Sequence, residues 1–137
     1  MGDHGRIPAF TRYDGPSYRI IKKLARENRL SLNIDIYVIS AKYGLINSSY
    51  SIDKYNRKMT PARAIKLRPK ILQVICNLFE NNLFDDVFIN MGKLYLLSIE
   101  GIENILPEGT RLIYAKGRIG QKNSQMKKWL LEKNEYS

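Results

Sequence analysis

Three short apolar runs, each leading into a glycine-bearing segment, constrain the fold of this chain more than any other feature. They occupy residues 33–40, 86–91 and 111–115, and helical patterns of apolar residues precede, separate and follow them. This alternation of helix and strand is typical of parallel strands joined by right-handed crossovers. We predict an α/β fold with a small, mostly parallel sheet of about three to four strands, flanked by helices in three layers.

The helical patterns cover residues 17–29, 60–81, 94–99 and 121–133. Thr60 followed by Pro61 predicts a capped helix start, and Pro69 is expected to kink that helix or to begin a second one. We divide the chain into an irregular N-terminal segment 1–12, a single α/β domain 13–133 and a polar tail 134–137.

The composition indicates the class of binding partner more clearly than it indicates a reaction. The net charge of +10 favours nucleic acid first and an acidic membrane surface second, although a basic composition without any polyanion is the alternative. No apolar run approaches the ~20 residues that span a bilayer, and the N-terminus lacks a signal-peptide core, so we expect no membrane partner and a cytoplasmic location. The one histidine and the one cysteine, His4 and Cys76, lie too far apart in sequence to supply a metal site, and neither GxGxxG nor a Walker P-loop indicates a cofactor.

The candidate site follows from where the predicted strands end. Ligands of parallel sheets bind beyond the carboxyl ends of the strands, and segments 41–54, 92–95 and 116–121 leave those ends. Each segment contains a glycine, a lysine and an aromatic or amide side chain, so we expect one rim that suits a nucleotide or an extruded base. The residues assigned to ligand or base contacts are Ser40, Lys42, Tyr43, Gly44, Tyr55, Asn90, Gly92, Lys93, Tyr95, Lys116, Gly117, Gly120 and Gln121.

A basic run abuts the tyrosine-rich stretch 39–59. Seven Lys or Arg residues occur between Lys54 and Lys70, which indicates either a solvated helical face or a phosphate-facing patch. The residues assigned to nucleic-acid backbone contacts are Arg57, Lys58, Arg63, Lys66 and Arg118. Asp53 is the only carboxylate in the three strand-exit segments, so it is the candidate general base, with an ion pair to Lys54 or Arg57 as the structural alternative.

Several short motifs carry a family resemblance. Ser40-x-x-Tyr43-Gly44-Leu45, followed by Ile52-x-x-Tyr55 and Met59, resembles the signature loop of the YaaA family (peroxide-stress protein, DUF328) and is still closer to the compact DUF6884 family. Residues 13–19, 90–95 and 119–121, together with Trp129-Leu130, also resemble DUF6884, so the similarity covers residues 8–131. One departure is that the strand ending in a Cys-x-x-Lys-like turn, which usually precedes the Pro-Ala-x-x-x-Tyr segment, has no counterpart before Pro8.

The resemblance implies a fold related to the uracil-DNA-glycosylase-like superfamily, and a role in DNA damage response or defence. We therefore predict a nucleic-acid-binding domain, for DNA rather than RNA, that processes a base or nucleotide as a hydrolase of N-glycosidic bonds. Two alternatives remain open: an enzyme or binder of a free nucleotide or phosphorylated metabolite, and a non-catalytic interaction module. The absent first strand would leave a sheet edge exposed, through which two copies could pair as a homodimer.

Overall fold

The computed structural model describes residues 6–55 and 57–135; residues 1–5, 56 and 136–137 lie outside that description. Its contacts divide the chain into two compact units, each assembled from segments that are distant in sequence. Unit 1 contains the chain up to Tyr37, then Asn47–Lys54, and the chain from Ala115 onward. Unit 2 contains Val38–Ile46 and Tyr55–Tyr114. The single domain over residues 13–133 stays a prediction.

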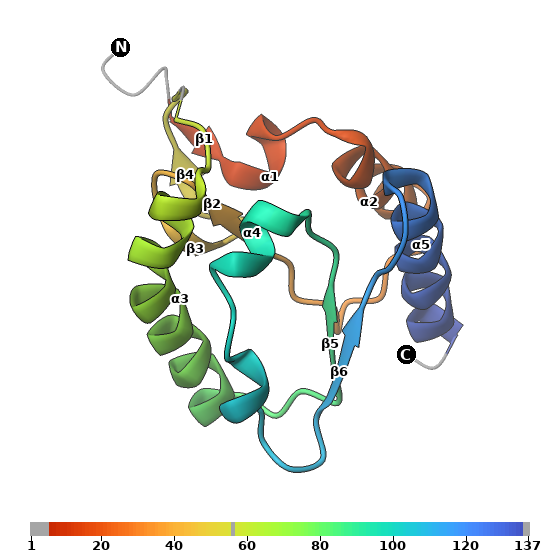
Figure 1. The fold of residues 1–137 in the computed structure, drawn as a ribbon. Helices are drawn as coiled ribbons and strands as arrows, with labels where there is room; N and C mark the ends of the chain where they lie inside the picture. The colour runs from red at the N-terminus through yellow and green to blue at the C-terminus, as the bar shows by residue number, and fades with distance from the viewer. Residues whose placement is uncertain (1–5, 56, 136–137) are drawn as a thin grey trace. The chain divides into compact units, whose positions relative to one another are not determined.

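Unit 1 consists of helices α1, α2 and α5 and the short strand pair β1–β4 (Figure 1). Its elements are β1 (Ile7–Pro8), α1 (Ala9–Arg12), α2 (Pro16–Arg26), β4 (Ser51–Ile52) and α5 (Ile119–Glu135). Helices α2 and α5 pack against each other, and their buried side chains include Leu24 on α2 and Met126 and Leu130 on α5. Helix α2 begins at Pro16, one residue before the predicted start at residue 17, and proline is well suited to the first position of a helix.

The prediction of an irregular N-terminal segment is wrong from Ile7 onward. Ile7 lies opposite Ile52 in the antiparallel β1–β4 pair, and Ala9 opens α1 with its N–H donating to Tyr50 O at 2.8 Å. These elements are held by partners about 40 residues away along the chain, so the local sequence pattern carries no sign of them. Part of the predicted segment, residues 1–5, lies outside the described residues, as do residues 136–137 of the predicted tail.

Unit 2 holds the longest helix and most of the strands. Its elements are β2 (Tyr37–Ser40) and β3 (Gly44–Asn47), which begin or end one residue inside unit 1, then α3 (Pro61–Asn81), β5 (Asp86–Ile89), α4 (Lys93–Leu97), a 3-10 turn η1 (Ile102–Asn104) and β6 (Arg111–Tyr114). Strands β5 and β6 run parallel with Asp86 opposite Arg111. The Arg111 guanidinium donates to both carboxylate oxygens of Asp86, at 3.1 and 2.9 Å, which fixes this register.

The mixed α/β class is confirmed, but the mostly parallel, three-layer sheet is not. Among the described residues the strands form three two-stranded sheets, β1–β4, β2–β3 and β5–β6, of which β5–β6 alone is parallel. The apolar run that ends at Ser40 was expected to lie beside β5 and β6. It pairs with β3 instead, because a turn of only residues 41–43 returns the chain antiparallel to β2.

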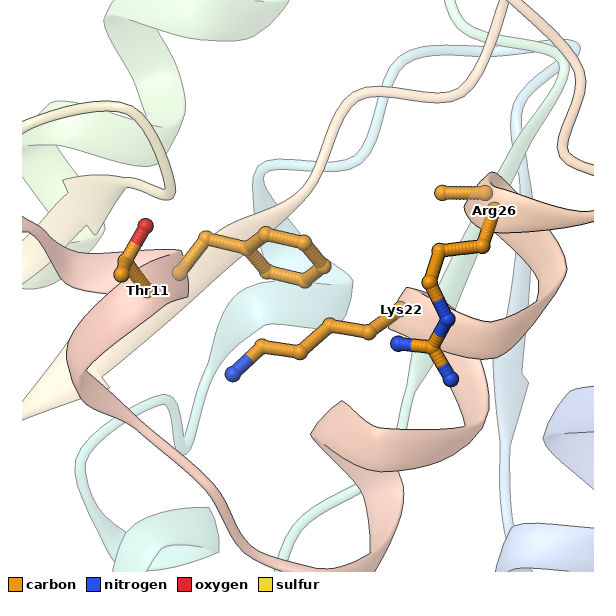
Figure 2. A pocket seen from close by; sticks show the side chains of 5 residues that line it. Thr11, Lys22 and Arg26 are labelled. Atoms are coloured by element: carbon orange, nitrogen blue, oxygen red, sulfur yellow. The ribbon is translucent and has the colours of Figure 1, made fainter.

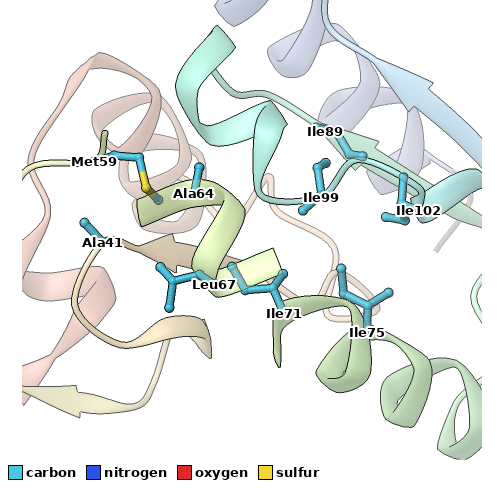
Figure 3. Packing of buried hydrophobic residues seen from close by; sticks show 9 residues of the cluster. All are labelled: Ala41, Met59, Ala64, Leu67, Ile71, Ile75, Ile89, Ile99 and Ile102. Atoms are coloured by element: carbon cyan, nitrogen blue, oxygen red, sulfur yellow. The ribbon is translucent and has the colours of Figure 1, made fainter. Parts of the chain in front are cut away.

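Helix α3 supplies much of the core of unit 2 and also contacts the segment that follows β2. Thr60 caps it as predicted, since its side chain accepts the N–H of Arg63 at 3.1 Å. The helix continues through Pro69, which neither ends it nor starts a second one. Figure 3 shows its buried face in the core cluster, which comprises Ala41, Met59, Ala64, Leu67, Ile71, Ile75, Ile89, Ile99 and Ile102. Ala41, the first residue of the β2–β3 turn, and Met59 both belong to this cluster, so the core of unit 2 reaches the turn.

None of the helices in residues 6–55 and 57–135 combines the length and the apolar character that crossing a membrane requires.

Candidate functional site

A buried serine organises the turn between β2 and β3. Ser40 is 1% exposed, and its Oγ accepts the backbone N–H groups of Lys42 at 3.1 Å and Tyr43 at 3.0 Å. The same hydroxyl donates to the Oη of Tyr55 at 2.8 Å. One side chain therefore closes the turn and fixes a tyrosine fifteen residues further along. We call Ser40, Lys42, Tyr43, Gly44 and Tyr55 the Ser40 hairpin site.

Gly44 lets the chain leave this turn into β3. Its φ of +78° lies in the left-handed region, which side chains with a Cβ adopt only with strain. A Cβ built there would make only an ordinary contact, at 3.7 Å, with Cγ1 of the core residue Ile71, so the backbone conformation is what favours glycine. Glycine is thus the residue that this turn requires.

Arg63, near the start of α3, donates hydrogen bonds to the backbone of the β2–β3 turn. Its Nε donates to the carbonyl oxygen of Ala41 at 2.8 Å and its Nη2 donates to that of Lys42 at 3.3 Å. The prediction gave Arg63 a phosphate contact. Its guanidinium satisfies two backbone carbonyls within unit 2, and the phosphate contact itself stays a prediction.

Two tyrosine rings and one ammonium group form the outer part of the site. Tyr43 and Tyr55 lie edge to face, with ring centroids 5.7 Å apart at an interplanar angle of 85°. Nζ of Lys42 lies 5.2 Å from the Tyr43 centroid and 5.9 Å from the Tyr55 centroid, within cation–π range of both rings. The side chains of this turn thus combine positive charge with aromatic faces.

Tyr95 on α4 lies close enough to Tyr55 of the Ser40 hairpin site to interact with it electrostatically. Burial raises the pKa of Tyr95 above its ordinary value of 10.0, and the nearby Tyr55 raises it further. The Tyr95 phenol is already neutral at neutral pH, and the raised pKa extends this neutral form to more alkaline pH. Elsewhere in unit 2, burial and the hydrogen bond to Glu103 raise the pKa of Tyr114 to about 12.

Several predicted cations of unit 2 remain exposed. Arg57, Lys58, Lys66 and Lys93 make no ion pair or hydrogen bond with any residue that the structure describes. Arg68, by contrast, donates to Leu97 O at 2.8 Å and to Glu100 at 3.0 Å. No Asp or Glu occurs anywhere between Tyr55 and Phe79, so the exposed cations of this stretch face no acidic neighbour within it.

The remaining predicted residues fall into two groups. Asn90, Gly92 and Lys93 belong to unit 2, where they connect β5 to α4 and Gly92 is the N-cap of that helix. Asp53 and the whole segment 116–121 belong to unit 1. The structure therefore brings together Ser40, Lys42, Tyr43, Gly44 and Tyr55, while the single rim built from all three strand exits stays a prediction.

The segment before α5 has its own hydrogen bonds. Gln121 Oε1 accepts the N–H of Arg118 at 2.8 Å, and the Gln125 side chain bonds both the N–H and the carbonyl of Lys116, at 2.9 and 2.8 Å. Gly117 has a φ of +97°, and a Cβ there would collide with the Gln121 side chain. Gln121, predicted to contact a ligand, therefore caps the start of α5, whereas the side chains of Lys116 and Arg118 are exposed.

Sequence reasoning missed how Ser40 and Arg63 act. A serine at the end of a strand, with a glycine four residues later, is a local signal for a side chain that bonds the following turn. The reach of Arg63 back to Ala41 has no such signal, because it depends on tertiary packing. Among the described residues, no group of three or more His, Cys, Asp or Glu could hold a metal ion.

Comparison of the chain with protein-family models, curated proteins and solved structures finds no match in any of the three. The resemblance to the DUF6884 and YaaA families therefore stays a prediction.

Proposed function

We propose that this chain is a nucleic-acid-binding α/β domain similar to the DUF6884 and YaaA families, and that the Ser40 hairpin site contacts the nucleic acid. The observation that carries this proposal is the Lys42 ammonium over the two edge-to-face rings of Tyr43 and Tyr55. This combination offers an aromatic face to a base and a cation to the adjoining phosphate.

The hydrogen bonds of the turn make the site rigid before any ligand arrives. Ser40 supplies three of them and Arg63 supplies two more. A site that is already ordered loses little conformational entropy on binding, so more of the stacking energy contributes to affinity. Stacking of a base on an aromatic side chain is worth about 1–3 kcal/mol.

The exposed cations of unit 2 favour a polymeric ligand over a single nucleotide at this site. Arg57 and Lys58 precede α3, Lys66 lies on α3 and Lys93 opens α4, and all four cations are exposed without a partner among the described residues. A chain of phosphates can neutralise several such cations at once and release their counterions.

The second part of the proposal is that the domain hydrolyses the N-glycosidic bond of a bound base. The family resemblance implies hydrolysis of an N-glycosidic bond, for which a bound base must leave the stack and enter a site. Asp53 is the carboxylate that we assign as general base. Release of free base from damaged DNA, abolished in Asp53→Asn with binding retained, is the result that supports this role; unchanged release contradicts it.

Binding itself is tested by fluorescence anisotropy of a labelled DNA oligonucleotide over a range of salt concentrations. We expect log K to fall linearly with log salt, and Lys66→Gln to reduce the magnitude of that slope by about 1. Lys128→Gln, which removes an exposed cation from α5, is the matched control. Affinity that is independent of salt, or equal effects of the two variants, would contradict the proposal.

The aromatic part is tested with Tyr43→Leu, which keeps an apolar side chain but removes the ring. We expect DNA affinity to fall by about 5- to 150-fold, the equivalent of one lost stacking contact. Tyr50→Leu removes a half-exposed tyrosine from unit 1 and should leave affinity unchanged. If Tyr43→Leu binds as tightly as the parent chain, the Ser40 hairpin site is not the stacking surface.

A further inference from the structure

A cavity of about 370 Å³ lies between α1 and α2, entirely within unit 1. Figure 2 shows Thr11 on α1 and Lys22 and Arg26 on α2 around it, and Phe10 and Ala25 complete the lining. We call this the α1–α2 pocket. Its volume falls within the roughly 300–1,000 Å³ typical of small-molecule sites. It shares no residue with the Ser40 hairpin site.

Lys22 is held inside this pocket in a fixed position. Its side chain is only 22% exposed, and its Nζ donates to Tyr13 O at 2.7 Å while lying 5.6 Å from the Phe10 ring centroid. Asp14 approaches Nζ no closer than 4.0 Å. That carboxylate also accepts two hydrogen bonds from Arg19, at 3.3 and 3.2 Å, so the positive charge of Lys22 is only partly balanced.

Arg26 adds a second positive charge to the same wall. It follows Lys22 by four residues on α2, which places both side chains on one face of the helix. Arg26 is exposed and makes no hydrogen bond or ion pair with any described residue. Like charges at this spacing repel each other, so an anion bound between them would relieve a repulsion that the free protein contains.

The other residues that line the α1–α2 pocket suit a flat ring of a ligand. Phe10 is half-buried with its ring beside the Lys22 ammonium, Ala25 is small, and Thr11 brings a hydroxyl to the rim. A phosphate between Lys22 and Arg26 can receive the forked donors of the guanidinium, while an attached ring can stack on Phe10.

We propose that the α1–α2 pocket binds a nucleoside monophosphate, with its phosphate on Lys22 and Arg26 and its base on Phe10. The volume of about 370 Å³ and the five-residue lining favour a single nucleotide over a polymer. This site is independent of the function proposed for unit 2, and either can fail without the other.

The charge contribution is tested by calorimetric titration of the full chain with AMP and UMP. Arg26→Gln should weaken binding about tenfold or more, because one charge-assisted interaction with the phosphate is lost. Lys23→Gln is the matched control: it removes the same charge from the same helix, is exposed and has no partner among the described residues, but does not line the pocket. Its affinity should stay within about twofold of the parent chain.

The base contact is tested with Phe10→Leu, whose folding is checked by its thermal unfolding curve. We expect this variant to bind AMP about fivefold or more weakly, and inorganic phosphate as the parent chain does. Equal affinities of Arg26→Gln and Lys23→Gln would overturn the site. So would the absence of AMP or UMP binding at millimolar concentration. Phosphate binding as tight as AMP binding, with Phe10→Leu unaffected, would overturn the nucleotide as ligand.

Discussion

The Ser40 hairpin site and the α1–α2 pocket both set a lysine ammonium beside an aromatic ring, but the protein holds the two arrangements differently. At the hairpin, a buried hydroxyl and the Arg63 guanidinium are bonded to the backbone of the turn, and Lys42 extends from it. In the pocket, Lys22 itself is bonded to a carbonyl and Arg26 has no partner among the described residues.

This difference indicates that the hydrogen bonds a basic side chain already makes, rather than its charge, determine whether it is available to bind a ligand. Arg63 and Arg26 are indistinguishable by residue type. The first already satisfies two carbonyls, and moving it to a phosphate would leave those oxygens without their donor. The second can accept a new partner without breaking any contact that the structure describes.

The comparison also predicts where substitutions cost stability. Ser40→Ala removes the acceptor of two backbone N–H groups and the donor to Tyr55 at a side chain that is 1% exposed. Groups left unsatisfied in a buried place cost about 1–3 kcal/mol, so we expect the free energy of unfolding in urea to fall by that amount. Thr11→Ala in the exposed rim of the pocket should change it by less than about 0.5 kcal/mol. Equal losses would mean that the hairpin is no more ordered than the pocket.

A slightly smaller effect is expected at the glycine of the hairpin. Gly44→Ala places a Cβ at a φ of +78°, which costs about 1–2 kcal/mol of unfolding free energy. Gly120→Ala is the control, because Gly120 lies in α5 and a Cβ there meets no atom within 4 Å. Alanine favours a helix over glycine by up to about 1 kcal/mol, so this variant should be as stable as the parent or more so. Chemical denaturation of both variants makes the measurement. A loss of stability in Gly120→Ala as large as that in Gly44→Ala would contradict the turn geometry.

The elements that could be predicted are those with a local periodic pattern. Helix α3, strands β5 and β6 and helix α5 lie within a few residues of their expected positions, and the β5–β6 pair is parallel as expected. The strands that were missed, β1, β3 and β4, have two to four residues each. The two-residue strands β1 and β4 are too short to show an alternation, and each exists because it pairs with the other across the chain. Strand β3 is as long as β5 and β6 but lies in segment 41–54, which we expected only to leave the end of a strand.

The site was predictable to a similar degree. The sequence assigned Ser40, Tyr43 and Tyr55 to ligand contacts, and the structure brings these three side chains together. The roles of Arg63 and Gln121 were not predictable, because sequence gives a side chain's charge or polarity but not the backbone group within its reach. The α1–α2 pocket depends on α1, whose four residues carry no helical period of their own.

The smallest expected effect concerns Asp14, whose carboxylate lies 4.0 Å from Lys22 Nζ. The hydrogen bond and the charge of Arg19 hold the pKa of Asp14 below its usual value of 3.8. Asp14 and Arg19 are 64% and 68% exposed, so Asp14→Asn should leave the unfolding midpoint in urea nearly unchanged at pH 7. It also removes a negative charge 4.0 Å from Lys22 Nζ, and AMP affinity should therefore rise about two- to threefold.

Acidification should erase this gain in affinity. Because the folded-state pKa of Asp14 is lowered, the carboxylate stays charged above pH 3.8 and its stabilising pair with Arg19 is lost only as the pH falls through that lowered pKa. AMP affinities of the parent chain and Asp14→Asn should thus differ at pH 7 and converge at the acid end, where the side chain at position 14 is neutral in both. Asp35→Asn, which removes an exposed carboxylate elsewhere in unit 1, is the control and should match the parent throughout. If Asp35→Asn raises AMP affinity as much as Asp14→Asn does, net charge rather than the α1–α2 pocket governs binding, and the contrast between the two sites fails.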